Sequence, residues 1–255
     1  MRILIAPAKK MKVDTDSFLP MRLPQFLPQA AVLLRRMQEM DYRQLKALWK
    51  CNDAIAAVSF EQVARGRLTE NLTPAILSYQ GIQYQYMAPH VFAHSHLQYI
   101  KEHLRILSGF YGLLRPFDGV IPYRLEMQAK LAVGDAKNLY GFWKDKLAHQ
   151  LCSETDVLLN LASKEYSKAI TPYLTPKTRF FTCIFGEKKE GKIIEKGTLC
   201  KMARGEMVRW LAEEGITDPY ALPSFRRLGY AFSKQDSTDR TFVFLKEADS
   251  PCRVS

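Results

Sequence analysis

The sequence predicts an α/β fold: a single domain in which a mixed β-sheet is flanked by helices. Two short apolar runs, at residues 2–6 (RILIA) and 156–163 (DVLLNLAS), are typical of buried strands. Other segments carry apolar residues at helical spacing, and strands that alternate with helices favour this fold class. No internal repeat or low-complexity linker divides the chain, so one domain is expected over residues 1–255, with a frayed tail after Glu247.

The individual elements follow from local signals. Asn138 is a suitable N-cap for one helix, and Gly215 is expected to close another helix. A charged turn containing Gly191 is expected to join two strands into a hairpin. Helices are expected at residues 23–40, 42–50, 54–63, 89–107, 138–151 and 199–215. Strands are expected at residues 2–6, 156–163, 179–185 and 192–196, and residues 229–247 are expected to form a strand, a polar turn and a final strand.

The charge balance favours an anionic partner. The chain has 37 Lys and Arg against 26 Asp and Glu, which gives a formal net charge of +11. Such an excess is typical of proteins that bind DNA, RNA or nucleotides. A basic surface spread without pattern, which only keeps the protein in solution, is the alternative reading.

Other compositional features indicate a cytoplasmic protein. The five cysteines are scattered and form no CxxC pair, which argues against a zinc cluster or a disulfide framework. The apolar run that ends before Pro7 is too short for a secretory signal. No segment approaches the roughly 20 apolar residues that span a bilayer, so no membrane partner is expected.

The most distinctive run covers residues 103–127 (HLRILSGFYGLLRPFDGVIPYRLEM). Its glycines permit close approach of the backbone, its prolines restrict the turns, and its arginines offer planar donors for phosphate or carboxylate. The pattern therefore predicts an anion site, although two turns and a strand with surface arginines would explain it equally well. The candidate anion-binding residues in this run are Ser108, Gly109, Gly112, Arg115, Tyr123 and Arg124.

Polar residues also follow the two clearest strands. Lys9 comes directly after the first strand and Asn160 lies near the end of the second. Ligands of α/β proteins collect beyond the carboxyl ends of strands, so both are site candidates, with a solvated loop lysine as the alternative for Lys9. Ser163 is better explained as a helix N-cap.

One predicted helix carries a basic face. Lys201 and Arg204 are three residues apart and share that face, which would be either an anion site or a solvated surface. Gly205 interrupts the helix at a cost of about 1 kcal/mol relative to Ala, which indicates close contact with another element or a ligand.

Several common chemistries lack their signatures. There is no GxSxG, Walker A or GxGxxG motif, which excludes the commoner hydrolase, NTPase and Rossmann classes. His90, His94 and His96 lie close together, but without a nearby carboxylate or cysteine they favour packing or surface roles over metal ligation. The sequence does not reveal whether any two of Asp118, Glu126 and Glu165 face each other.

The ordered set of fragments resembles the YaaA peroxide stress resistance family of bacteria. The resemblance covers nearly the whole chain and implies an unusual α/β fold with a deep, positively charged cleft. It implies a cytosolic oxidative-stress protein that protects DNA from peroxide- and iron-driven damage and affects iron homeostasis. It also implies a helix-hairpin-helix-like element, here the helix ending near Leu107 and the turn at residues 108–112, with affinity for duplex or branched DNA. The fragments are RILIAPAK, AILSYQGIQY, the run at residues 103–127, LYGFWKDKL, VLLNLASKEYSKAI, KMARGEM and GYAF.

Two functional hypotheses follow. In the first, the protein binds DNA independently of sequence through phosphate contacts. In the second, it is an enzyme acting on a nucleobase, nucleotide or related small anion, with Lys9, Tyr111 and Asn160 as catalytic candidates. Neither hypothesis includes a metal or a cofactor. The DNA- or anion-binding set is Lys9, Ser108, Gly109, Gly112, Arg115, Tyr123, Arg124, Lys201 and Arg204.

Overall fold

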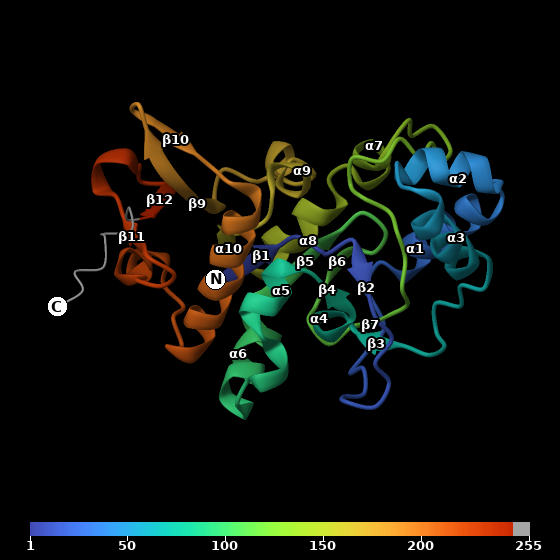
Figure 1. Cartoon of the computed structure of the whole chain (residues 1–255), viewed down its shortest axis with the longest axis horizontal. Helices are drawn as coiled ribbons and strands as arrows, with labels where there is room; N and C mark the ends of the chain where they lie inside the picture. Colours follow the sequence, from blue (N-terminus) through green and yellow to red (C-terminus); the bar gives the residue numbers. More distant parts are fainter. Residues whose placement is uncertain (247–255) are drawn as a thin grey trace.

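The computed structural model describes residues 1–246, so the tail expected to fray after Glu247 lies outside the described residues (Figure 1). Within residues 1–246, eight strands form one mixed sheet in the order β11-β12-β9-β8-β1-β5-β6, with β10 paired to β9. The strands of this sheet are β1 (Arg2–Ile5), β5 (Leu104–Ser108), β6 (Gly112–Leu114), β8 (Val157–Asn160), β9 (Arg179–Lys189), β10 (Lys192–Ile194), β11 (Tyr230–Phe232) and β12 (Thr241–Lys246).

The centre of the sheet is parallel. β1 pairs in parallel with both β5 and β8, and the parallel order continues through β9 to β12. β6, β10 and β11 are antiparallel to their neighbours. Because parallel neighbours end at the same edge, the loops after β1 and β8 leave the sheet side by side. Two small additional pairs join β2 (Lys10–Met11) with β4 (Tyr79–Gln80) and β3 (Thr73–Pro74) with β7 (Gly119–Val120).

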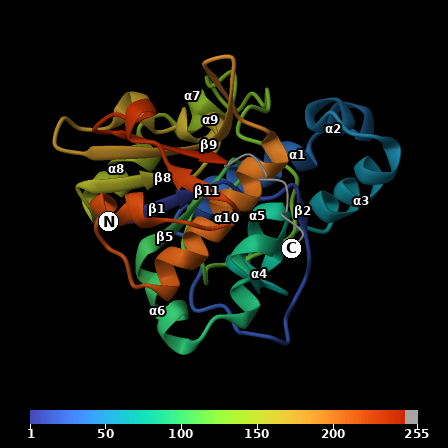
Figure 2. The same cartoon turned by 60° about the vertical axis from the view of Figure 1, so that its left-hand side comes forward.

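Helices flank the sheet and form two groups. α1, α2 and α3 lie together at one end of the molecule, whereas α5, α6 and α10 pack near the middle of the sheet (Figures 1 and 2). The α-helices are α1 (Leu27–Gln38), α2 (Tyr42–Trp49), α3 (Asp53–Ala64), α4 (Ala75–Ser78), α5 (Ile82–Met87), α6 (His94–His103), α7 (Leu139–Trp143), α8 (Lys146–Glu154), α9 (Lys164–Ser167) and α10 (Gly197–Glu213). Short 3-10 helices occur at Pro89–Val91, Thr171–Tyr173, Pro219–Ser224 and Lys234–Asp236.

Most of the expected elements are confirmed, including the strands β1 and β8, the β9–β10 hairpin and the final two strands. The Asn138 side chain accepts a hydrogen bond from the N–H of Gly141 at 3.0 Å, as expected for an N-cap. Gly215 follows α10 with a φ of 63°, the conformation that favours glycine after a helix. The α/β fold class with a mixed sheet flanked by helices is therefore confirmed.

Two expected helices are interrupted. The helix expected at residues 138–151 divides into α7 and α8 at Lys144, whose φ is 45°. The helix expected at residues 89–107 ends at His103, because the chain from Leu104 onward is strand β5. All five residues of β5 are buried beside β1, so pairing with the central sheet overrides the helical pattern.

The close approach of α5 and α10 depends on Gly205. A Cβ atom at this position would lie 2.1 Å from the carbonyl oxygen of Gln83, which is far inside van der Waals contact. The contact expected from a glycine inside a helix is therefore made with α5. This packing places the start of α5 next to the basic face of α10.

Candidate anion-binding site

A cavity of about 400 Å³ lies beyond the carboxyl ends of β1 and β8, and we call it the Lys9 pocket. The loop after β1 supplies Lys9, and the segment after β8 supplies Glu165. α10 contributes Lys201 and Arg204, so segments far apart in the sequence meet here. The charged residues that line the pocket are Lys9, Lys10, Arg124, Glu126, Glu165, Lys201 and Arg204, five basic and two acidic side chains.

Carboxylates neutralise only part of this basic set. The Nζ atom of Lys9 lies 2.9 Å from Oε1 of Glu126, and Arg204 lies 3.4 Å from Glu195. Arg124 lies 3.9 Å from Glu126, at the limit of an ion pair. No carboxylate within residues 1–246 forms an ion pair with Lys201. The pocket therefore retains positive charge for an incoming anion.

Three residues that line the pocket each carry a buried donor atom with no hydrogen-bond partner among residues 1–246. These atoms are Nε2 of Gln83, Nε of Arg124 and Nε of Arg204. Gln83 is 7% exposed, so bulk water does not reach its amide freely. Buried donors normally have an acceptor, and one left unpaired costs about 1–3 kcal/mol. All three atoms are donors, so a group that pairs with them has to supply acceptor atoms.

Two carboxylates share the pocket, which answers a question that the sequence left open. Glu126 and Glu165 both line it, whereas Asp118 lies elsewhere. Burial raises the pKa of the Glu165 carboxyl, and the negative charge of Glu126 adds to this; a hydrogen bond from the N–H of Gln128 and the charge of Lys9 oppose it. A carboxyl with a raised pKa beside a second carboxyl paired with lysine is an arrangement suited to acid–base chemistry.

Of the residues predicted from sequence, Lys9, Tyr123, Arg124, Lys201 and Arg204 line the Lys9 pocket together. Lys9 reaches the pocket because it follows β1, whose carboxyl end lies at the same edge of the sheet as that of β8. The packing of α10 on α5 accounts for the two residues of the helix.

Ser108 instead has a structural role inside the core. Its Oγ lies 2.6 Å from the hydroxyl of Tyr123 and accepts the backbone N–H of Tyr111 at 2.9 Å. The hydroxyl of Tyr123 also lies 2.7 Å from that of Tyr79. Ser108 is fully buried and does not reach solvent, so its predicted contact with a phosphate backbone is wrong in this conformation.

The expected helix-hairpin-helix-like element is corrected in the same region. β5 and β6 form an antiparallel hairpin around residues 109–111, so strands occupy the places of the helices. A Cβ at Gly109 would lie 2.6 Å from the carbonyl oxygen of Leu125, and one at Gly112 would lie 2.8 Å from the Trp143 ring. Both glycines are therefore needed for internal packing, and their turn faces protein rather than solvent.

The catalytic candidates Tyr111 and Asn160 do not line the Lys9 pocket. The Tyr111 hydroxyl accepts the backbone N–H of Ile121 at 3.2 Å, and burial raises the pKa of this phenol. The Asn160 Oδ1 accepts the N–H of Ala162 at 3.0 Å and shapes the loop after β8. The Tyr111 ring also packs edge-on against the ring of Tyr123, which does line the pocket.

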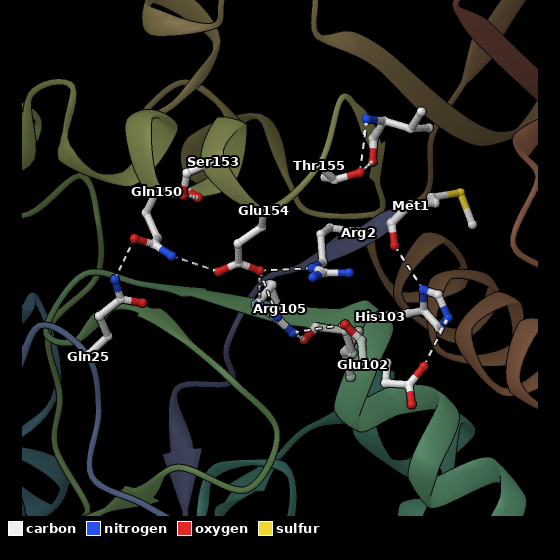
Figure 3. Close-up of polar contacts among 12 residues, drawn as sticks. Met1, Arg2, Gln25, Glu102, His103, Arg105, Gln150, Ser153, Glu154 and Thr155 are labelled. Carbon is white, nitrogen blue, oxygen red and sulfur yellow. Dashed lines mark hydrogen bonds and ion pairs between the residues drawn. The ribbon is translucent and has the colours of Figure 1, made fainter.

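Arg115 lies in a different cavity of about 350 Å³. β6 runs antiparallel to β5, so the chain after β6 returns to the amino end of the parallel strands, opposite the Lys9 pocket. Figure 3 shows polar contacts near this second cavity, where Glu154 accepts Arg2 at 2.8 Å and Arg105 at 2.6 Å. Burial opposes ionisation of Glu154, but hydrogen bonds from Gln150 and Arg2 and the charge of Arg105 lower its pKa. The expectation that Arg115 shares a site with Lys9 is therefore wrong.

Sequence reasoning missed several residues of the pocket. Gln83 and Tyr84 come from the start of α5, and Tyr166 comes from α9. The Tyr84 hydroxyl donates to the carbonyl of Ala6 at 3.1 Å, which ties α5 to the loop after β1. The only local signal was Gly81 within SYQGIQY, where a Cβ would lie 2.9 Å from that of Ala8.

Within residues 1–246, no group of three or more His, Cys, Asp or Glu is placed to hold a metal ion. Of the clustered histidines, His96 accepts the N–H of Ala93 at the start of α6 and its ring packs on Phe92. Among all the described helices, none combines the length and apolar character needed to cross a bilayer.

The fold and the pocket together define an α/β protein with a ligand-sized, predominantly basic site at the carboxyl edge of its sheet. Residues 1–236 match the family described as peroxide stress protein YaaA, and the chain belongs to this family. Its similarity to curated relatives extends over nearly their whole length. A UPF0246 protein from Agathobacter rectalis is 51% identical over 97% of this chain and 99% of the relative. UPF0246 proteins from Desulfitobacterium hafniense (50% identical, 96% and 98%) and Lachnoclostridium phytofermentans (52% identical, 96% of both) are similar to it as well.

Proposed function

We propose that this member of a peroxide stress family binds a small, acceptor-rich anion of the nucleotide class in the Lys9 pocket. The observation that carries the proposal is the set of three unpaired donors on Gln83, Arg124 and Arg204. A phosphate group offers several acceptor oxygens to such donors, and arginine binds it with well-defined geometry. Lys9 and Lys201 also line the pocket and add positive charge.

The dimensions of the cavity support a small ligand. A volume of about 400 Å³ lies within the range of roughly 300–1,000 Å³ that is usual for small-molecule sites. A duplex, whose major groove alone is about 12 Å wide, would have to lie across the mouth of the pocket. The second of the two hypotheses drawn from sequence is therefore the better supported one.

The chemistry available in the pocket is proton transfer. Glu165 has a raised pKa and Glu126 is held by Lys9, so the two carboxyls differ in environment. We assign Glu165 as the candidate acid and Glu126 as the candidate base, with Lys9 orienting Glu126. These roles replace the ones that the sequence assigned to Tyr111 and Asn160.

Calorimetric titration with inorganic phosphate, pyrophosphate and nucleoside 5′-phosphates tests the proposal. Wild type is expected to bind at least one of them, and Arg204→Gln is expected to weaken binding about 10-fold, because a charge-assisted hydrogen bond contributes about 1.5–3 kcal/mol. Arg115→Gln, a change of the same kind in the other cavity, is the matched control and is expected to bind like wild type. Binding that is absent in wild type, or lost equally in both variants, would overturn the proposal.

Sequence-independent DNA binding is a second candidate function. It is supported by the net charge of +11 and by the shared position of Lys9, Arg124, Lys201 and Arg204 around one opening. Phosphate contacts of this kind predict that affinity falls about 10³-fold between 50 and 200 mM salt. An electrophoretic mobility assay at both salt concentrations, with duplex and four-way branched DNA, tests it. Affinity unchanged by salt would exclude this mode of binding. Under either candidate function, protection of DNA and any effect on free iron would follow indirectly, from the bound ligand or from the bound nucleic acid.

A further inference from the structure

A second cavity of about 470 Å³ adjoins the Lys9 pocket, and we call it the Trp49 pocket. It lies between the end of α2 and residues 128–130. Lys9, Arg124 and Glu126 line both cavities. The Lys9–Glu126 ion pair is therefore a side-chain partition between two compartments of one site. The Lys9 side chain is 64% exposed, so this partition has room to move aside.

The Trp49 pocket has an apolar part and a polar part. Met40, Ala47, Leu48, Trp49 and Ala129 form the apolar part of its wall. This part suits a planar or apolar group. The remaining lining residues are Lys9, Arg124 and Glu126, which the two pockets share, and Gln44, Lys50, Gln128 and Lys130.

In the wall of this pocket, the indole N–H of Trp49 lacks a hydrogen-bond partner. The residue is 3% exposed, and its Nε1 is buried without a hydrogen-bond partner among residues 1–246. By contrast, the Nε1 of the equally buried Trp143 donates to the carbonyl of Gly109 at 2.9 Å. A buried indole N–H normally finds an acceptor, so the Trp49 pocket is suited to a ring that carries one.

We propose that the two compartments bind one bipartite ligand, with its phosphate in the Lys9 pocket and its heterocyclic ring in the Trp49 pocket. This inference rests on the proposed function, since it specifies the second half of the same ligand. The ring nitrogens and carbonyl oxygens of a nucleobase are acceptors for the Trp49 N–H, and its faces suit the apolar wall. An acyl chain would fill the wall but leave the indole N–H unpaired. The nucleotide is either free or an unpaired nucleotide of a single strand, which the experiment separates.

The test compares ligands that share the phosphate and differ in the ring. Wild type is titrated with inorganic phosphate, ribose 5-phosphate, AMP, UMP and a single-stranded oligodeoxynucleotide. At least one mononucleotide, or the oligonucleotide, is expected to bind about 10-fold or more tightly than ribose 5-phosphate, because burying a ring and pairing one N–H contributes more than 1 kcal/mol. Tight binding of the oligonucleotide alone would assign the ring to a strand, and tight binding of the mononucleotide would assign it to a free ligand.

Two variants locate the ring. Ala47 is exposed on α2, so Ala47→Phe fills the Trp49 pocket without disturbing the core and is expected to remove the gain over ribose 5-phosphate. Trp49→Phe keeps an aromatic ring but removes the N–H and is expected to weaken nucleotide binding about 2–12-fold. Ala57→Phe, at an exposed position of α3 outside both cavities, is the matched control and should bind like wild type.

The outcomes distinguish this inference from the proposed function. Ribose 5-phosphate binding by Ala47→Phe shows that the variant is folded and that its Lys9 pocket is intact. If phosphate and ribose 5-phosphate bind but the ring adds nothing, or if Ala47→Phe keeps the full gain, the bipartite ligand is refuted and the anion site remains. If no phosphate compound binds wild type, the proposed function itself is refuted.

Discussion

The Nζ atom of Lys9 lies 2.9 Å from Oε1 of Glu126, and this pair joins the loop after β1 to the segment that follows β7. The two residues are distant in the sequence, and both line the Lys9 pocket and the Trp49 pocket. Because the Lys9 side chain is 64% exposed, the pair contributes little to stability. In the proposed two-compartment site, this pair separates the compartments and sets their shared charge.

Removing the negative charge of Glu126 is expected to strengthen anion binding. Glu126→Gln frees Lys9 and removes repulsion of about 1 kcal/mol, so affinity for pyrophosphate should rise about 5-fold. Calorimetric titration measures the change. Glu61→Gln removes a carboxylate from an exposed ion pair with Arg65 on α3 and is the matched control. Weaker binding by Glu126→Gln would show that Glu126 contacts the ligand favourably.

Gly205 is expected to be indispensable for the packing of α10 on α5. In Gly205→Ala the new methyl group would meet the carbonyl of Gln83, and the helices would have to separate at a cost of about 3 kcal/mol. Urea unfolding measures this loss. Gly197→Ala, at the start of the same helix and with nothing within 4 Å of the new Cβ, should be neutral or stabilising by up to about 1 kcal/mol. Equal stability of the two variants would contradict the close approach.

Asp118 is expected to make stability depend on pH. Burial raises its pKa to about 6, although a hydrogen bond from the N–H of Arg115 and the charges of Arg115 and Arg22 oppose this. The folded protein then holds a proton that the unfolded chain, with a pKa near ~3.9, has released. Stability from this group is therefore full below pH 4 and is lost as the pH rises through 6, by about 2–3 kcal/mol.

Asp118→Asn removes this titration and leaves an amide oxygen that can accept the N–H of Arg115. Between pH 4.5 and 7.5, the free energy of unfolding of wild type should therefore fall relative to that of the variant, by most of these ~2–3 kcal/mol. Chemical denaturation at a series of pH values provides the comparison. Parallel pH profiles for wild type and variant would mean that the carboxyl titrates normally.

The hydroxyl chain of Ser108, Tyr123 and Tyr79 is expected to stabilise the fold rather than to bind ligand. Tyr123→Phe leaves the buried Tyr79 hydroxyl without this partner and should lower the free energy of unfolding by about 1–3 kcal/mol. Pyrophosphate affinity should stay within about 2-fold of wild type. A large loss of affinity with unchanged stability would place the Tyr123 hydroxyl in the binding site instead.

Local patterns were sufficient for much of the fold. Some elements depend only on residues close in sequence, so local patterns predict them. They are the apolar run of β1, the hairpin around Gly191 and the caps at Asn138 and Gly215. The local pattern of β5 predicts the end of a helix, whereas its strand conformation comes from pairing with β1 and β6. Those partners lie far away or across a turn, and a helical pattern does not record them.

The sequence by itself determined the α/β class, the excess of basic residues, and the presence of Lys9, Arg124, Lys201 and Arg204 near strand ends or on one helical face. Only the tertiary structure decided which of them meet. The antiparallel return of β6 sends Arg115 to the opposite edge of the sheet, although it is only nine positions from Arg124 in the sequence. Tight packing encloses Ser108 and Gly109, which a sequence pattern cannot distinguish from an exposed glycine turn. Gln83 and Trp49 became candidates only in three dimensions, because a missing hydrogen-bond partner is a property of the folded surroundings and not of the residue.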